Sequence, residues 1–258
     1  MKVEQTIAGL RRQLADRREP IGLVPTMGAL HAGHVALFDA ARKECRCVVA
    51  SVFVNPAQFG PNEDFARYPR DDEHDAAAAA AAGVDILFRP AVDELYPPGY
   101  QTWVDVEALA KPLEGEFRPG HFRGVATICL KLFNIVRPRR AYFGQKDAQQ
   151  AMVVQRMVRD LNLDVELRIL PTVRDADGLA LSSRNAYLSS NERARALALP
   201  RALATRDPAR ALEMMREAGI EPDYVDVLAD GDTRVLAAAA RVGKTRLIDN
   251  VPLEGGFE

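Results

Sequence analysis

A pair of histidines at the start of an expected helix is the first group in this sequence that could do chemistry. The segment 25–34, PTMGALHAGH, reads as the end of a strand, a turn and a helix that begins near Gly33. Backbone N–H groups and the helix dipole there attract an anion, and Gly28 lets a phosphate approach the backbone closely. His31 and His34 stand three residues apart, so a helical turn places both imidazoles on one face. The pattern predicts a phosphate site, with a loop carrying two surface histidines as the alternative.

A lysine follows a second expected strand in the segment 143–150, FGQKDAQQ. Parallel strands bind ligands beyond their carboxyl ends, so Lys146 is expected near the histidines, as a point charge for phosphate. Asp147 is expected either to cap the following helix or to contact the ligand. Gln150 falls one turn further on and is expected to face the same cleft.

A third polar group is the segment 180–185, ALSSRN. The two hydroxyls of Ser182 and Ser183 and the guanidinium of Arg184 suit the tail of a triphosphate. A solvated hairpin tip is the alternative, because turns are commonly polar.

Two further segments carry side chains that suit a small polar acid. The segment 55–72 follows a strand and contains two amides that could bind a polar substrate, Asn55 and Gln58. The segment 118–127 contains three side chains that could meet a carboxylate: Arg118, His121 and Arg123. A packed loop with satisfied polar groups is the alternative for the second segment.

The elements that must position these groups alternate between strand and helix up to about residue 170. Strands are expected at 21–26, 47–54, 85–90, 141–144 and 165–170. Helices are expected from Val3 to Leu14 and at 34–45, 71–83, 125–136 and 146–162. The alternation predicts an α/β fold with a parallel sheet. The long irregular segment 91–123 is expected to be functional.

The pattern changes after this point. A hairpin is expected at 174–189, helical segments up to about Gly219, and strands at 224–229 and 245–251. This part reads as a smaller α+β unit. We therefore expect two domains, residues 1–172 and residues 173–258.

Composition limits the class of protein and its partners. The 258 residues are 48% hydrophobic and 27% charged, which is typical of a globular protein and excludes disorder as the main state. A net charge of −2 gives no indication of a nucleic-acid or membrane partner. The three cysteines do not suggest a disulfide framework, and no signal peptide or membrane span is recognisable, so a cytoplasmic location is expected.

Together the five polar segments resemble, in their order, the signatures of the pantothenate synthetase family, the pantoate–β-alanine ligases. With GKTRLIDN at 243–250, the resemblance covers the chain from residue 3 to residue 251. This family belongs to the nucleotidyltransferases and has an HxGH element similar to that of class I aminoacyl-tRNA synthetases. The resemblance implies a Rossmann-like domain, a C-terminal lid domain, a homodimer, and ATP with Mg²⁺ as substrate.

The resemblance also implies a two-step reaction. The carboxylate of pantoate attacks the α-phosphorus of ATP and expels pyrophosphate, and the amine of β-alanine then attacks the adenylate and releases AMP. Preorganised donors for the developing charge should do most of the catalysis.

The roles follow residue by residue from the resemblance. Catalysis falls to His34, His31 and Lys146. ATP binding falls to Met27, Gly28, Ala29, Leu30, His31, Ala32, Gly33, His34, Gly144, Gln145, Lys146, Asp147, Val173, Leu181, Ser182, Ser183 and Arg184. The resemblance assigns pantoate binding to Gln58 and Gln150, and places Gln58 near β-alanine as well. Mg²⁺ is expected on phosphate oxygens and water, with no protein ligand assigned.

Three questions stay open at this point. His34 could act as an acid or as a hydrogen-bond donor to the transition state. The segment 191–221 is shorter than the usual family lid, which bears on how the lid packs and closes. The alternatives are an adenylyltransferase of another small acid or phosphate ester, and a nucleotide-binding regulatory module without catalysis.

Overall fold

Six short segments rich in β-branched and apolar residues form one parallel sheet. The computed structural model describes residues 1–17, 19–61, 63–255 and 257. The strand order is β1-β4-β3-β2-β5-β6, and each neighbouring pair is parallel. The strands are β1 (Lys2–Glu4), β2 (Ile21–Thr26), β3 (Cys47–Val52), β4 (Ile86–Phe88), β5 (Arg140–Gly144) and β6 (Glu166–Leu170).

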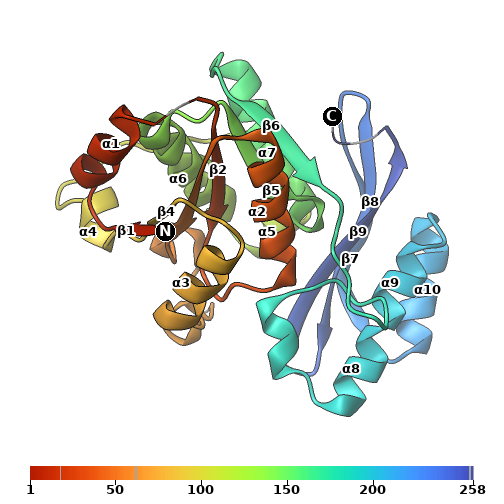
Figure 1. Ribbon diagram of the computed structural model, residues 1–258. Coiled ribbons are helices and arrows are strands. Elements are labelled where there is room, and N and C mark those ends of the chain that lie inside the picture. The colour runs from red at the N-terminus through yellow and green to blue at the C-terminus, as the bar shows by residue number, and fades with distance from the viewer. Residues whose placement is uncertain (18, 62, 256, 258) are drawn as a thin grey trace.

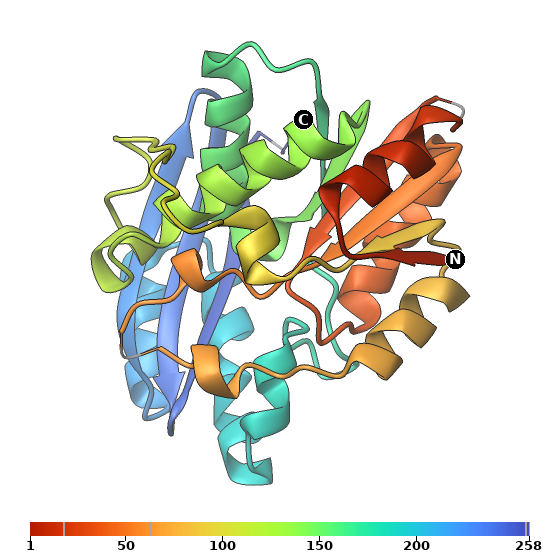
Figure 2. The same ribbon diagram turned by 90° about the vertical axis from the view of Figure 1, so that its left-hand side faces the viewer.

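Helices cover both faces of this sheet (Figure 1 and Figure 2). One face is covered by α1 (Ile7–Ala15), α6 (His121–Val136) and α7 (Ala148–Asp160), and the other by α2 (Ala32–Glu44) and α3 (Asp72–Ala81). Successive residues of β2 divide between the two cores, because Leu23 packs on the first side and Val24 on the second. The expected α/β class and its parallel sheet are confirmed.

The start of the chain differs from the expected single helix. Val3 lies in β1, which pairs with the short strand β4 in parallel register. The helix begins only at Ile7, after Thr6, whose side chain accepts a hydrogen bond from the backbone N–H of Gly9. The apolar spacing from Val3 to Leu14 suits a helix, but the Thr6 cap fixes a later start.

The expected irregular segment contains two helices of one turn, α4 (Val92–Leu95) and α5 (Glu114–Phe117). α6 begins at His121, earlier than the expected residue 125. Gly120 precedes it with a φ of 81°, a left-handed conformation that glycine adopts without strain. The turn therefore places His121 at the first position of a helix that packs into the core.

A second sheet is antiparallel and has the order β7-β8-β9. Its strands are β7 (Glu221–Asp230), β8 (Thr233–Val242) and β9 (Thr245–Glu254). The central strand β8 was not expected, because its run of four alanines is more typical of a helix. In the structure Ala238, Ala239 and Ala240 are fully buried, as are Val235 and Leu236 of the same strand, and pairing with β7 on one side and β9 on the other holds the segment extended.

Three short helices cover the outer face of this sheet (Figure 1). They are α8 (Ser190–Ala196), α9 (Ala198–Leu203) and α10 (Pro208–Glu217). α10 follows α9 closely, and Asp207 caps it by accepting hydrogen bonds from Ala209 and Arg210. Leu203 and Met215 are fully buried, so the short segment still closes a complete core.

The expected hairpin at 174–189 is reduced to one bridge between Arg174 and Ala180, followed by the 3₁₀ helix η4 (Ser183–Tyr187). The other face of the second sheet packs on the first layer, where Val235 and Ala237 contact Ala148 and Met152 of α7. In the described ranges, no helix is long and apolar enough to cross a membrane.

Candidate active site

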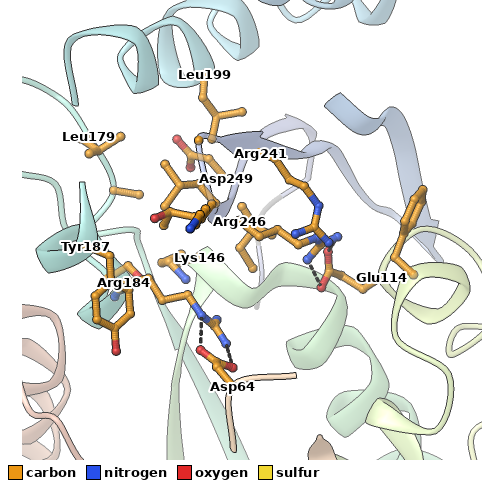
Figure 3. A pocket seen from close by; sticks show the side chains of 18 of the residues that line it. Asp64, Glu114, Lys146, Leu179, Arg184, Tyr187, Leu199, Arg241, Arg246 and Asp249 are labelled. Carbon is orange, nitrogen blue, oxygen red and sulfur yellow. Dashed lines mark hydrogen bonds and ion pairs between the residues drawn. The ribbon is translucent and has the colours of Figure 1, made fainter. Parts of the chain in front are cut away.

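A cavity of about 230 Å³ lies at the edge of the parallel sheet where β2, β3 and β5 end. Most of the side chains that the sequence singles out line it: Met27, His31, Gly33, His34, Gln58, Gly144, Lys146, Asp147, Gln150, Val173, Leu181, Ser182, Ser183 and Arg184. A larger cavity of about 990 Å³ adjoins it between the two sheets and shares Lys146, Asp147, Ser182 and Arg184 (Figure 3). The structure therefore gathers the separate polar segments around one space.

The two histidines cap the helix that carries them. His31 precedes α2, and its Nδ1 accepts a hydrogen bond from the N–H of Gly33 at 3.1 Å. The Nδ1 of His34 accepts from the N–H of His31 at 3.3 Å, and the two ring centroids lie 4.2 Å apart. An imidazole whose Nδ1 accepts must carry its proton on Nε2 when it is neutral. Both rings therefore have an Nε2–H available as a donor.

Burial keeps these imidazoles neutral. Burial, followed by the neighbouring His31, lowers the pKa of His34 to about 3. Burial, followed by the charge of Lys146, also lowers the pKa of His31. At neutral pH the pair therefore offers two N–H donors and carries no positive charge of its own.

A buried carboxylate that the sequence analysis did not single out holds the preceding loop. Asp75 of α3 is 2% exposed and accepts hydrogen bonds from the N–H groups of Ala29 and Leu30, at 3.0 and 2.7 Å. Gly28 and Ala29 both have positive φ, 84° and 51°, so the loop needs this support. Asp75 shares the buried face of α3 with Ala79, but in the sequence it is only one of three acids in the first turn of a helix, which gives no signal of its own.

The lysine turn is held from the other sheet. Lys146 lies in the 3₁₀ helix η3 (Gln145–Asp147). The buried Asn250 of β9 donates hydrogen bonds to the backbone oxygens of Gln145 and Lys146, at 2.8 and 3.0 Å. The second sheet thus fixes the backbone from which the Lys146 side chain reaches the cavity.

Asp147 does not cap the helix with its side chain, so that interpretation is wrong. Its carboxylate lies 3.5 Å from the Nζ of Lys146. Burial raises the pKa of Asp147, but Lys146 and Arg184 outweigh it, so the net shift is downward. The carboxylate is therefore ionised beside the cavity.

The turn that carries Ser182, Ser183 and Arg184 is held by the carboxylate of Asp64, which belongs to the part of the chain with the parallel sheet. Ser182 accepts a hydrogen bond from the N–H of Arg184, and the N–H of Leu181 bonds to the oxygen of Val173. The guanidinium of Arg184 donates to both oxygens of Asp64, at 3.3 and 3.2 Å (Figure 3). The arginine expected at a triphosphate is therefore already paired.

Of the side chains predicted to bind a small polar acid, some line the cavity and others bond only within the protein. The Asn55 side chain is used within the protein, because its Oδ1 accepts from Ala57 and its Nδ2 donates to Gln58 and Gly124. Gln58 and Gln150 line the cavity. Arg123 lies 4.0 Å from Asp105, half-exposed, and lines neither cavity described above.

Some predicted ATP residues do not line the smaller cavity: Gly28, Ala29, Leu30, Ala32 and Gln145. The backbone of Ala29 and Leu30 serves the contact with Asp75, and the side chain of Gln145 bonds to Asn250 at 3.2 Å. Ala29, Leu30 and Gln145 therefore support the two turns through contacts on the side away from the cavity.

An ion pair joins the two layers beside the site. Arg246 of β9 donates to both oxygens of Glu114 in α5, at 2.9 and 2.6 Å (Figure 3), and its Nε donates to Asp223 of β7. Burial raises the pKa of Glu114, but Arg246 outweighs it and holds that pKa low. Buried pairs of this kind fix relative placement more than they add stability. The sequence analysis missed this pair, although GKTRLIDN contains Arg246.

Comparison with known proteins shows the family of this chain. The family model described as Pantoate-beta-alanine ligase matches residues 2–252. The chain is 55% identical to the pantothenate synthetase of Moorella thermoacetica, with 98% of this chain and 99% of the relative covered. It is 52% identical to that of Chloroflexus aurantiacus, with 99% of each covered.

Solved structures give the same result. The structure of pantothenate synthetase from Thermus thermophilus matches with a TM-score of 0.90 and 49% identity, covering 97% of this chain and 99% of that one. The enzyme from Francisella tularensis, solved with Beta-gamma ATP and β-alanine, matches with a TM-score of 0.87 and 34% identity, covering 98% and 97%. The fold and the site define an ATP-dependent acid–amine ligase of the HxGH type. The chain belongs to the pantoate–β-alanine ligase family.

The comparison also bears on length. The alignment with the M. thermoacetica protein spans 281 positions, whereas this chain has 258 residues, so at least 23 positions are gaps in this chain. The relative therefore has residues at positions where this chain has none. The placement of the difference within residues 191–221 stays a prediction.

Proposed function

We propose that this protein condenses pantoate with β-alanine, using ATP and releasing AMP and pyrophosphate. The observation that carries the proposal is the pair of neutral imidazoles, His31 and His34, with Nε2–H donors at a cavity that Lys146, Gln58 and Gln150 also line. Such a set can bind a carboxylic acid beside the α-phosphate of a nucleotide. The F. tularensis structure with Beta-gamma ATP and β-alanine supports both as substrates here.

In the first step the pantoate carboxylate attacks the α-phosphorus of ATP, and pyrophosphate leaves. Negative charge grows on the phosphoryl oxygens, and fixed donors in a dry site stabilise it. His31 and His34 donate through Nε2–H, and Lys146 supplies a charge. Because the pKa of His34 is held at about 3, we assign it a hydrogen-bonding role rather than net proton transfer. ATP enters with Mg²⁺ on its phosphates.

The remaining ATP contacts are assigned to the turns around the cavity. Ser182, Ser183 and Arg184 hold the leaving phosphates. The backbone of Val173 and the side chain of Asp147 contact the nucleotide.

In the second step the neutral amine of β-alanine attacks the carbonyl carbon of the adenylate, and AMP leaves. Gln58 and Gln150 hold the pantoyl group in place, with Gln58 also beside the amine substrate. Water must be excluded until the amine arrives, since the adenylate hydrolyses. We assign this exclusion to the second sheet and its helices, acting as a lid over the larger cavity.

The proposal includes the organisation of the protein. Residues 1–172 form the ATP- and pantoate-binding domain, and residues 173–258 form the lid. The protein works as a homodimer in the cytoplasm. The three cysteines are free and buried, which fits a reducing compartment.

The test is ATP–pyrophosphate exchange with pantoate and Mg²⁺ and without β-alanine. The proposal predicts exchange that requires pantoate, and AMP release that requires β-alanine. AMP or pyrophosphate release that is independent of β-alanine would favour an adenylyltransferase. ATP binding without exchange would favour the non-catalytic module.

A further inference from the structure

The backbone oxygen of Gln58, which the proposed function assigns to pantoate, is bonded by two side chains. One is His121 of α6, and the other is Arg118 in the turn that precedes α6. Gln58 ends the 3₁₀ helix η1 (Pro56–Gln58) and is 7% exposed. Its carbonyl oxygen lies 2.9 Å from the Nδ1 of His121 and 3.3 Å from the Nη2 of Arg118. This contact fixes the main chain from which the Gln58 side chain enters the cavity.

The proton positions on His121 follow from its other neighbour. Its Nε2 lies 3.2 Å from the Nη1 of Arg118, and a guanidinium can only donate. Nε2 therefore accepts, and Nδ1 carries the proton that it donates to Gln58. Burial, followed by the charge of Arg118, lowers the pKa of His121 to about 4, so the ring stays neutral.

Arg118 is itself anchored. Its Nε and Nη2 donate to the two oxygens of Glu63, at 2.9 and 2.8 Å. Glu63, Arg118 and His121 thus form a directed chain of hydrogen bonds that ends on the Gln58 carbonyl. No nitrogen of His121 is left to bind a substrate carboxylate.

The side-chain amide of Gln58 is oriented by the side chain of Asn55. The N–H of Ala57 donates to the Oδ1 of Asn55, so the Nδ2 of Asn55 must be the donor to the Oε1 of Gln58, at 3.0 Å. The Gln58 Nε2 therefore keeps its N–H groups for the cavity. These donors suit the oxygens of a carboxylic acid or of its adenylate.

Close packing makes the position of η1 depend on α6. Gly124 of α6 faces Ala57, and a Cβ at Gly124 would overlap the Ala57 backbone. The Gly124 oxygen also accepts a hydrogen bond from Asn55 at 3.1 Å. The segment 55–58 therefore packs directly on the first turn of α6, which contains His121 and Gly124.

We propose that His121 is a positioning residue for the acid substrate, acting through the main chain of Gln58 and backed by Arg118 and Glu63. This inference rests on the proposed function, because it takes Gln58 to bind pantoate. His121 lines the cavity, but both of its ring nitrogens are engaged, by Arg118 and by the Gln58 oxygen, so it acts through the main chain of Gln58. Its loss moves the Gln58 amide, and small displacements of positioning groups are costly to turnover.

The experiment measures kcat and the KM values for pantoate and ATP with the full-length protein. His121→Ala is expected to raise the pantoate KM about 10-fold, as for loss of a buried hydrogen bond, with the ATP KM changed less than about 2-fold. His121→Asn should restore most of the affinity, because the Asn Nδ2 can replace the Nδ1 donor. Glu63→Gln, which weakens the anchor of Arg118, should raise the pantoate KM by about 2- to 3-fold.

Two comparisons separate positioning from a merely structural role. In a Gln58→Ala background, His121→Ala should change the pantoate KM less than about 2-fold, since the side chain it positions is absent. The matched control is Thr127→Val, a buried polar position of α6 that bonds to Val104 instead. It should lower the melting temperature and leave the pantoate KM unchanged.

Equal changes in both KM values, or an undiminished effect in the Gln58→Ala background, would overturn the inference. Failure of His121→Ala to fold leaves the decision to His121→Asn and Glu63→Gln, and unchanged pantoate affinity in Glu63→Gln would then contradict it. Wild-type protein without pantoate-dependent exchange would refute the proposed function itself, and this inference with it. Normal wild-type exchange with unaffected variants would refute only the inference.

Discussion

Two turns at the same cavity are held in opposite ways. The histidine turn (residues 28–34) is fixed by uncharged hydrogen bonds within α2 and by the buried Asp75 behind it. The serine–arginine turn (residues 181–184) is fixed through its own guanidinium, which is paired with Asp64. The reactive N–H groups of the first turn are free, whereas the reactive cation of the second is occupied.

The difference separates two tasks. The donors at the α-phosphate must be in place before the reaction, so their support comes from groups that never touch substrate. Arg184 directs its Nε and one Nη2 donor at Asp64, so the leaving phosphates must compete with that carboxylate for them or bind the remaining N–H groups. The first turn is therefore expected to control kcat, and the second to control ATP affinity.

The largest effect is expected from removal of the His34 donor. His34→Ala should lower kcat by about 10²- to 10³-fold or more, because the developing charge loses a fixed donor. His34→Gln can place an amide N–H near the position of Nε2, and should retain more activity than His34→Asn. Single-turnover formation of the adenylate is the measurement. Near-normal turnover in His34→Ala would remove this residue from the mechanism.

The support of the histidine turn gives the next largest effect. Asp75→Asn replaces one of two acceptors by a donor that faces a backbone N–H, and should lower kcat by about 10-fold or more. Asp72→Asn is the matched control, because Asp72 lies on the same helix with its side chain 63% exposed. It should leave kcat unchanged. Equal effects of the two substitutions would show that Asp75 does not hold the turn.

The second turn should respond in ATP affinity. Asp64→Asn removes the competing charge from Arg184, and should lower the KM for ATP by about 2- to 5-fold with kcat little changed. Arg184→Ala should raise that KM. Steady-state kinetics at varied ATP distinguishes these outcomes. An ATP KM that rises in Asp64→Asn would mean that Asp64 positions the guanidinium rather than competing for it.

The smallest effect concerns stability and pH. The pKa of His34 is about 3 and that of His121 about 4, both below the ordinary 6.5, so the unfolded chain binds more protons between these values. Stability is therefore greatest above about pH 6.5 and falls as the pH decreases, by about 1.4 kcal/mol per pH unit for each histidine. Urea unfolding at pH 7, 6 and 5 should show a shallower fall for His34→Gln. A slope equal to that of the wild type would contradict a His34 that stays neutral in the folded protein.

The sequence was sufficient for the parallel sheet and for most, though not all, of the residues predicted to line the cavity. Apolar strands alternate with well-marked helices, and parallel strands bring the turns after β2 and β5 to one edge. It was insufficient where tertiary packing decides. The alanines of β8 form a strand because they pair with β7 and β9 on either side, and Val3 lies in the edge strand β1, paired with β4, rather than starting a helix.

Supporting contacts were also beyond the sequence pattern. Asp75 reads as an acid in the first turn of a helix, a common surface feature, and only the fold turns it toward the histidine turn. Arg246 and Glu114 are far apart in the chain, so their pairing depends on how the two sheets pack. Asp is a residue type that commonly caps helices, but the carboxylate of Asp147 pairs with Lys146 instead.

The most direct test of this account is the protonation state of His34. Nitrogen NMR of histidine-labelled protein, with His34→Gln used to assign the signal, reports which ring nitrogen carries the proton as the pH is lowered. The account predicts a neutral ring, protonated on Nε2 with Nδ1 unprotonated, from pH 8 down to about pH 5. A ring that becomes doubly protonated near pH 6.5, or one that carries its proton on Nδ1, would contradict it.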